Sequence, residues 1–229
     1  MQPLDNPAWY ALTGPHATVA EGGELARRYR PDYSVWSAIG DAADPAAWSE
    51  LRGIVGEGGD ALFGHLPCHP ADWETMQAFP IRQLVLDDPI DPHPLAQLPA
   101  SVLVEPLTLR DADEMATLAR ATEPGPWCER TGELGNFFGI RIDGRLVAMA
   151  GERLRLPTAV EISGVCTDAR YRSRGFAAAL VVEVARQIQA GQATAFLHVR
   201  DANTAAISVY ERLGFRCRTM TTVSLVRAR

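Results

Sequence analysis

Residues 160–177 read Val160-Glu161-Ile162-Ser163-Gly164-Val165-Cys166-Thr167-Asp168-Ala169-Arg170-Tyr171-Arg172-Ser173-Arg174-Gly175-Phe176-Ala177, and an apolar segment follows as far as Ala190. Side chains alternate along a strand, so one predicted face carries Val160, Ile162, Gly164 and Cys166, and the other carries Glu161, Ser163, Val165 and Thr167. A polar turn begins at Asp168. From Phe176, apolar residues recur every four positions at Leu180, Val184 and Ile188, which predicts a helix that ends near Gly191.

The junction between this turn and the predicted helix has the properties of an anion site. The first amides of a helix have no partner within the helix, and the helix dipole adds partial positive charge, so phosphate is a common ligand there. Gly175 and Ala177 leave the backbone accessible, and Arg172 and Arg174 add fixed positive charge. A Walker loop needs a lysine, which this chain lacks, and a dinucleotide-binding turn needs more glycines.

Two patterns in the right order resemble those of the GNAT acyltransferase superfamily. Arg172-x-x-Gly175-x-Ala177 resembles its acetyl-CoA pyrophosphate loop, Q/R-x-x-G-x-G/A. After a predicted strand at residues 194–199, residues 203–215 resemble the second signature, N-x-x-A-x-x-x-Y-x-x-L-G-F, at every specified position. The resemblance implies an α/β (α+β) fold with a mixed, mostly antiparallel central sheet flanked by helices. It also implies an acetyl-CoA-dependent N-acetyltransferase.

The resemblance covers residues 101–229, which are predicted to form the GNAT N-acetyltransferase domain. Further segments at residues 137–167 resemble the glycine N-acyltransferase branch, and residues 1–100 are compatible with a degenerate GNAT-like module of that branch. In this N-terminal part, strands are predicted at residues 18–20, 33–39, 61–64 and 83–86, and helices from Asp44 and at 72–78. A proline-rich linker or an extended crossover is predicted at residues 87–99.

The C-terminal part has clearer local signals. A strand is predicted at residues 102–109, a helix from Arg110 through Ala119, and a loop at 123–135. Asp143-Gly144 is a two-residue turn that predicts a hairpin of strands 137–142 and 145–156. The tail at residues 215–226 is predicted to supply the closing strands.

The resemblance also implies a set of cofactor-binding residues. Pyrophosphate would contact Arg172 and the amides of Ser173, Arg174, Gly175, Phe176 and Ala177. The backbone around Val165, Cys166 and Thr167 would pair with the pantetheine arm, as an added strand would. Strands 160–167 and 194–199 are expected to splay apart and admit the thioester. Asn203 is expected to cap a helix and to face the pantetheine, and Ser208 to lie near the cofactor.

Tyr210 and Glu161 are the predicted catalytic residues. Tyr210 matches the tyrosine that protonates the departing CoA thiolate in many GNAT enzymes, and a phenol suits a leaving group of similar basicity. Glu161 is the predicted general base, with Glu152 and His198 as weaker substitutes. Each also has a structural interpretation, as a packed aromatic ring, a hydrogen-bonded carboxylate or a structural histidine. Direct attack of the amine needs no acyl-enzyme, so Cys166 is not a required nucleophile.

Composition narrows the partners and locations that are compatible with the sequence. The chain has 229 residues and a net charge of −6, which argues against nucleic acid as a partner. No apolar run reaches the length of a membrane span, so a cytoplasmic protein that does not bind membranes is expected, with four free cysteines. Prolines interrupt the histidine-rich segment at residues 65–69, so no metal site is predicted. The sequence does not identify the acceptor amine, which can belong to a small molecule or to a protein N-terminus. A homodimer is also possible, and the alternative function is a non-catalytic acyl-CoA-binding sensor or scaffold.

Overall fold

The computed structural model describes residues 2–66 and 68–229, and its main feature is an eight-stranded sheet. The strand order is β4-β11-β5-β10-β9-β8-β7-β6. Only the β9–β10 pair is parallel among the described strands of this sheet. The expected mixed, mostly antiparallel sheet flanked by helices is therefore confirmed. The strands are β4 (Asp60–Phe63), β5 (Trp73–Leu86), β6 (Val104–Leu107), β7 (Phe137–Ile142), β8 (Arg145–Arg155), β9 (Ala159–Thr167), β10 (Thr194–Arg200) and β11 (Arg216–Ala228).

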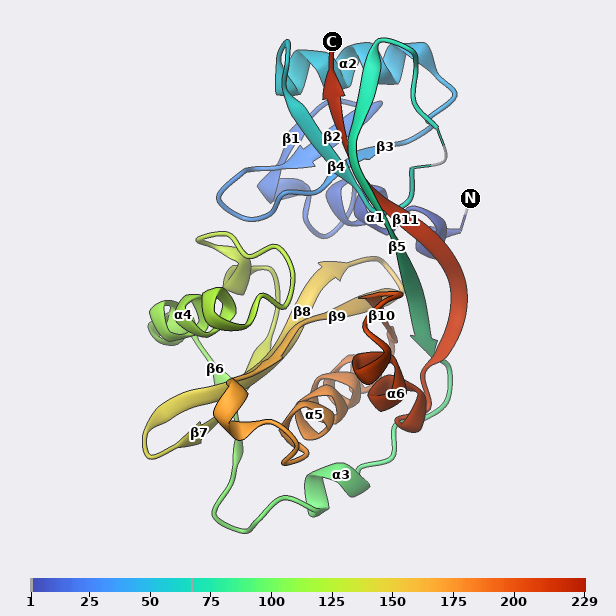
Figure 1. Ribbon diagram of the computed structural model, residues 1–229. Helices are drawn as coiled ribbons and strands as arrows, with labels where there is room; N and C mark the ends of the chain where they lie inside the picture. The colour runs from blue at the N-terminus through green and yellow to red at the C-terminus, as the bar shows by residue number, and fades with distance from the viewer. Residues whose placement is uncertain (1, 67) are drawn as a thin grey trace.

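A second, three-stranded sheet lies in the upper lobe of the molecule beside helix α2 (Figure 1). It comprises β1 (Ala20–Gly22), β2 (Ala26–Tyr29) and β3 (Ser37–Ile39). The helices are α1 (Pro7–Leu12), α2 (Pro45–Val55), α3 (His93–Ala96), α4 (Ala112–Thr122), α5 (Phe176–Ala190) and α6 (Thr204–Arg212), with short 3₁₀ turns η1 (Pro3–Asp5), η2 (Ala17–Val19), η3 (Leu109–Asp111), η4 (Thr131–Glu133) and η5 (Ala169–Tyr171).

Helices α4 and α5 pack on opposite faces of the central strands. The predicted stripe of α5 is confirmed, because Phe176, Leu180, Val184 and Ile188 are all buried. Alternation along β8 divides the core: Ala148 and Ala150 belong to the cluster under α5, and Met149 belongs to the cluster under α4. The hairpin between β7 and β8 is also confirmed.

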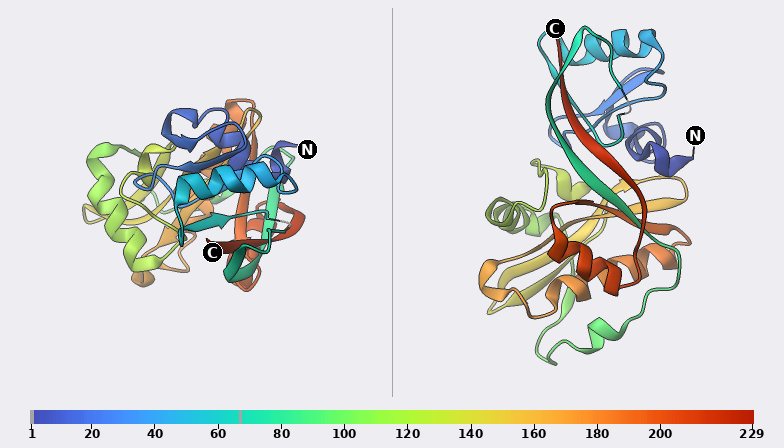
Figure 2. Two further views of the ribbon diagram at one scale, coloured as in Figure 1. Left: turned by 90° about the horizontal axis from the view of Figure 1, so that it is seen from above. Right: turned by 45° about the vertical axis from the view of Figure 1, so that its right-hand side comes forward.

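Strands β5 and β11 join the two lobes. They run side by side along the molecule (Figure 2) and pair from Trp73↔Ala228 to Val85↔Arg216. The sheet therefore takes strands from both sides of residue 100. The division into a 1–100 module and a 101–229 domain stays a prediction, as does the degenerate GNAT-like origin of the first part.

Three local predictions in the N-terminal part were wrong, and a fourth was incomplete. Residues 72–78 were predicted to be helical but begin β5, since backbone pairing with β11 outweighs the local preference. Residues 17–19 form a 3₁₀ turn in place of a strand at 18–20, and only Ser37–Ile39 of the predicted strand 33–39 is extended. The predicted linker at 87–99 contains the short helix α3.

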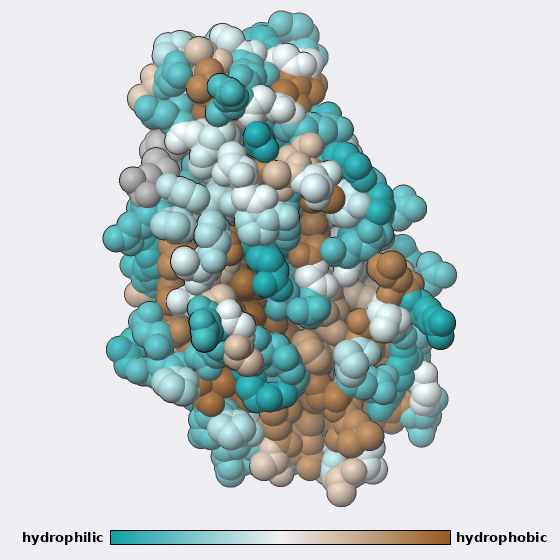
Figure 3. Space-filling view, turned by 180° about the vertical axis from the view of Figure 1, so that it is seen from behind, coloured by the Kyte–Doolittle hydropathy of each residue, from teal (hydrophilic) through white to brown (hydrophobic). Residues whose placement is uncertain are grey.

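The surface is hydrophilic over much of the upper lobe, and hydrophobic residues gather in the lower centre of the rear face (Figure 3). Leu103 and Leu109 are the most exposed large hydrophobic side chains of the described chain, and they lie on either side of β6. None of the helices in the described ranges has both the length and the apolar character needed to span a bilayer.

Candidate active site

A cavity of about 1710 Å³ opens between β9 and β10 and continues into the upper lobe. The two strands pair in parallel only from Thr194↔Ala159 to Phe196↔Glu161. Beyond this point they diverge, and Ser163 to Thr167 on β9 face His198 to Arg200 on β10 across the cavity. The splay that the family resemblance implied is therefore present.

Local backbone features of β9 contribute to this opening. The β8–β9 register shifts between Met149 and Gly151 and again between Glu152 and Arg155, and such bulges bend a strand. Gly164 has a φ of +64°, and a Cβ there would lie 3.0 Å from the ring of Phe137. Glycine suits this position because it tolerates positive φ and close packing.

The end of the cavity near the start of α5 has a backbone suited to an anion. Gly175 is the N-cap of α5, with a φ of +79° and no side-chain cap. A Cβ at Gly175 would meet no atom within 4 Å, so there is open space over the first turn of the helix. Arg172 and Ala177 line the cavity. A pyrophosphate therefore fits the residues present.

The predicted cofactor-binding residues occupy different places. Those that line the cavity are Val165, Cys166, Thr167, Arg172, Ala177 and Asn203. Thr167 Oγ1 is buried without a hydrogen-bond partner in the described chain, which suits a contact with a bound molecule. Asn203 caps α6 by accepting from the amide of Ala206 at 3.2 Å, so its capping role is confirmed.

The remaining predicted cofactor residues lie beside the cavity. The ring of Phe176 is buried in the core, so only its backbone is available to a ligand. The guanidinium of Arg174 lies over Tyr171 at 5.2 Å, and Ser173 has a φ of +60°. Ser208 is exposed, accepts from Arg212 Nη1 at 2.8 Å and is absent from the cavity lining. Ser208 therefore does not reach the site in this structure.

Tyr210 lies in the cavity wall with its side chain largely buried. Burial raises the pKa of its phenol to about 12, so the hydroxyl keeps its proton at physiological pH. Burial likewise raises the pKa of the Cys166 thiol to about 11. A proton donor and an unreactive thiol both suit direct transfer without an acyl-enzyme.

Glu161 has an environment that opposes its predicted role as a direct base. Its side chain is fully buried and accepts two hydrogen bonds from Arg153, at 2.8 Å from Nε and 2.7 Å from Nη2. Burial alone would raise the pKa of Glu161, but the charge of Arg153 and the hydrogen bonds from His198 and Arg153 lower it to about 2. Glu161 lies outside the cavity lining and both of its oxygens already accept from Arg153, so it does not reach an acceptor amine directly, and we correct the prediction on this ground.

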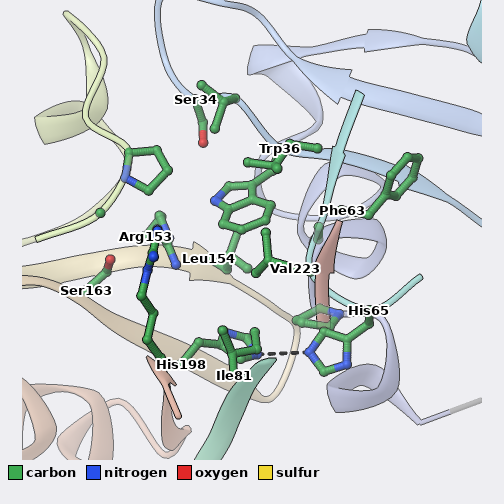
Figure 4. Close-up of a pocket in the computed structure, with 18 of the residues that line it drawn as sticks. Ser34, Trp36, Phe63, His65, Ile81, Arg153, Leu154, Ser163, His198 and Val223 are labelled. Carbon is green, nitrogen blue, oxygen red and sulfur yellow. Dashed lines mark hydrogen bonds between the residues drawn. The ribbon is translucent and has the colours of Figure 1, made fainter. Parts of the chain in front are cut away.

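His198 and His65 meet beside Glu161. Nδ1 of His198 lies 2.7 Å from Oε1 of Glu161, and the Nε2 atoms of the two histidines lie 3.0 Å apart (Figure 4). Both histidines line the cavity. Sequence reasoning named His198 only as a weaker substitute, and it missed His65 and Arg153 because no local pattern marks them. Glu152 instead accepts from the amide of Asn136 at 3.1 Å and lies outside the cavity lining.

Walls of the upper part of the cavity are mostly apolar. Trp36, Phe63, Ile81, Leu154 and Val223 surround this space, and Arg153 lies over the ring of Trp36 at 5.3 Å (Figure 4). Such a chamber suits a ligand with an apolar body and few polar groups.

Two further features of the described residues are the state of the cysteines and the grouping of side chains that could bind a metal ion. All four cysteines are free, as predicted, with Cys166 buried and Cys68 and Cys217 exposed. In residues 2–66 and 68–229, no group of three or more His, Cys, Asp or Glu side chains could hold a metal ion.

Comparisons with known proteins identify a matching family model and similar solved structures. The model of the FR47-like protein family matches residues 137–224. A solved structure of a putative acetyltransferase from the GNAT family of Novosphingobium aromaticivorans is 35% identical, with a TM-score of 0.86 and full coverage of both chains. A GCN5-related N-acetyltransferase from Kribbella flavida shares the fold, with a TM-score of 0.66 at 18% identity over 96% of this chain and 93% of the other.

A curated relative matches a shorter region. The ribosomal protein bS18-alanine N-acetyltransferase of Escherichia coli K12 is 33% identical over 96 residues, which is 39% of this chain and 64% of the relative. The match thus covers slightly less than two thirds of that relative's length.

Proposed function

The chain belongs to the GNAT family of acetyltransferases, and from this premise we propose that it transfers an acetyl group from acetyl-CoA to an amine in a ternary complex. The observation that carries the proposal is the single cavity that joins the anion-suited start of α5 to the fork between β9 and β10. A cosubstrate and an acceptor can therefore meet inside one chamber. Holding both reactants in place converts a bimolecular step into an effectively unimolecular one.

Each part of the cavity supports one task in this proposal. Acetyl-CoA supplies an activated acyl group as a thioester. Arg172 and the amides of residues 173–177 hold the pyrophosphate, and the backbone near Val165 and Thr167 holds the pantetheine arm. The amide near Val165 polarises the thioester carbonyl. Tyr210 gives its proton to the thiolate as the C–S bond breaks.

The acceptor occupies the upper chamber in this proposal. An amine on a small molecule and the N-terminus of a protein both fit the family's chemistry, and the curated relative's name refers to an alanine of a ribosomal protein. The apolar walls around Trp36 and Phe63 favour an acceptor with an apolar group near its amine. A cytoplasmic location and a homodimer stay predictions.

Binding of acetyl-CoA is tested by thermal shift with acetyl-CoA, CoA and longer acyl-CoAs. A ligand at 100 times its Kd adds about 2.7 kcal/mol to the stability of the folded state. Gly175→Glu should abolish the shift, because its carboxylate enters the open space over the first turn of α5. Gly144→Glu is the matched control, since Gly144 also has a positive φ and open space around its Cβ position but lies in the turn between β7 and β8 and not at the start of α5.

Both substitutions should lower the melting temperature through backbone strain, and only Gly175→Glu should lose the acetyl-CoA response. Release of the CoA thiol with a panel of primary amines then separates an enzyme from a sensor. Binding without release on every amine would support the non-catalytic alternative. No shift with any acyl-CoA would refute the binding site and the function together.

A further inference from the structure

The two cavity histidines come from distant parts of the chain. His198 lies on β10, just past the point where β9 and β10 diverge, and His65 follows β4 in the upper lobe. Their rings pack edge to face with centroids 5.1 Å apart. Their contact places a group from residues 1–100 at the fork where the thioester is proposed to lie.

Gln83 on β5 fixes which ring nitrogen of His198 carries the proton. Arg218 donates to Oε1 of Gln83 at 2.9 Å, so the amide nitrogen of Gln83 must face the histidines. That nitrogen lies 3.2 Å from Nε2 of His198 and 2.9 Å from the carbonyl oxygen of Leu4. Because the amide donates, Nε2 of His198 accepts. Its Nδ1 then donates to the ionised Glu161, and His198 is in the neutral form that can take a proton.

The same logic orients His65. With Nε2 of His198 as an acceptor, Nε2 of His65 must be the donor in their 3.0 Å contact. The N–H of His65 and the amide of Gln83, whose nitrogens lie 3.5 Å apart, therefore share the single lone pair of this ring nitrogen. Nδ1 of His65 then carries a lone pair. This atom has no hydrogen-bond partner among the residues that the structure describes, and His65 itself lines the cavity.

We propose that His65 and His198, oriented by Glu161, form a two-imidazole relay that removes the proton of the acceptor amine. The inference rests on the proposed function and adds the catalytic base to it. The amine proton goes to Nδ1 of His65, and the proton on Nε2 of His65 goes to Nε2 of His198. The nitrogen forms its bond to the acyl carbon, the C–S bond breaks, and the thiolate takes a proton from Tyr210. The relay later loses its proton to solvent, and Tyr210 regains one.

The surrounding charges give the two imidazole rings different tasks in the relay. Glu161 on β9 faces His198 directly, and Arg153 on β8 balances part of its charge. His65 is also influenced by Arg218 on β11 and Asp5 in η1. Burial, with the nearby His198, lowers the pKa of His65 to about 3, so His65 passes the proton on without holding it. His198 can hold the proton because it contacts a carboxylate. Glu161 is therefore a positioning residue.

Imidazole NMR tests the relay in the free protein, without any acceptor. The chain has five histidines, so single substitutions assign each ¹⁵N-labelled ring. We expect Nδ1-protonated His198 and Nε2-protonated His65 at neutral pH. Because burial lowers the pKa of His65 to about 3, His65 should stay neutral as the pH falls toward 4. Glu161→Gln removes the carboxylate that accepts from Nδ1 of His198 and should therefore shift the ¹⁵N resonances of that ring. A His198 protonated on Nε2 at neutral pH, or a His65 that becomes charged near neutral pH, would overturn the relay.

Kinetics test the same relay in turnover, with CoA thiol release measured on benzylamine and on an alanyl tripeptide. His65→Gln keeps a donor near Nε2 of His198 but cannot pass a proton, so kcat should fall about 100-fold, with unchanged KM for acetyl-CoA and unchanged melting temperature. His198→Gln removes the ring that receives the relayed proton, so kcat should fall to a similar extent. His16→Gln replaces a buried histidine outside the cavity lining and should leave the rate unchanged.

The outcomes separate the relay from the function. Unchanged kcat in His65→Gln and His198→Gln, with active wild type, would refute the relay alone. If wild type releases no CoA with any amine, the proposed function fails, and the NMR result still decides whether the relay's protonation states are correct.

Discussion

The buried pair of Arg153 and Glu161 gives the sharpest stability prediction, and Arg153→Met is the decisive change. Glu161 has an ordinary pKa of 4.5 that falls to about 2 in the folded protein. One pKa unit corresponds to about 1.4 kcal/mol, so its environment contributes about 3 kcal/mol at pH 7. Removing one partner of a buried ion pair typically costs about 3–5 kcal/mol, because the other charge stays buried and unpaired. Arg153→Met should therefore destabilise the protein by about 3 kcal/mol.

The sign of the pH dependence adds a second, independent check. In wild type the pKa of Glu161 is lowered, so its contribution is complete above pH 4.5 and is lost as pH falls toward 2. In Arg153→Met, burial dominates and raises this pKa, so the carboxyl can become neutral on acidification. The stability deficit of the variant should therefore be largest at high pH and shrink as pH falls.

Urea unfolding of wild type, Arg153→Met, Glu161→Gln and the double variant Arg153→Met/Glu161→Gln measures these effects. The double variant removes both charges and should lose less stability than the two single losses together. If Arg153→Met costs under about 1 kcal/mol, or if the losses are additive, then the pair is solvated and the argument from burial is wrong.

Three further predictions concern catalysis, acceptor binding and pH. Tyr210→Phe should lower kcat about 100-fold while the thermal shift with acetyl-CoA stays unchanged, and an unchanged kcat would remove Tyr210 from the mechanism. Trp36→Ala opens the wall of the upper chamber, so KM for the amine should rise about tenfold with little change in KM for acetyl-CoA. A similar rise in both KM values would contradict a specific role of Trp36 in acceptor binding. Burial, followed by the charge of Arg155, lowers the pKa of His16 from 6.5 to about 4, so its contribution is present above pH 6.5 and is lost as pH falls through this window. Acidification from pH 6.5 to 5 should therefore lower the free energy of unfolding of wild type by about 2 kcal/mol. The free energy of unfolding of His16→Gln should depend less steeply on pH over this range, and equal slopes for the two proteins would contradict this assignment.

Local patterns were informative wherever neighbouring residues determine the structure. The period of apolar residues from Phe176 located α5, Asp143-Gly144 located the hairpin, and Asn203 located the start of α6. Each depends on backbone geometry within a few residues. The prediction for residues 72–78 was wrong for the opposite reason, because the conformation of this segment is set by pairing with β11 at the far end of the chain.

By itself, the sequence determined the family, the mixed sheet, the anion-suited turn at residues 172–177 and the candidate tyrosine. The turn and the tyrosine lie in contiguous segments whose residue spacing is itself the signature, and the family resemblance carried by these segments implied the mixed sheet. Only the tertiary structure showed that Arg153 neutralises Glu161 and that His65 meets His198 beside it. Charge and burial depend on neighbours across strands, and His65 and His198 are 133 residues apart in the chain. The protonation state of a buried side chain is therefore decided by the fold.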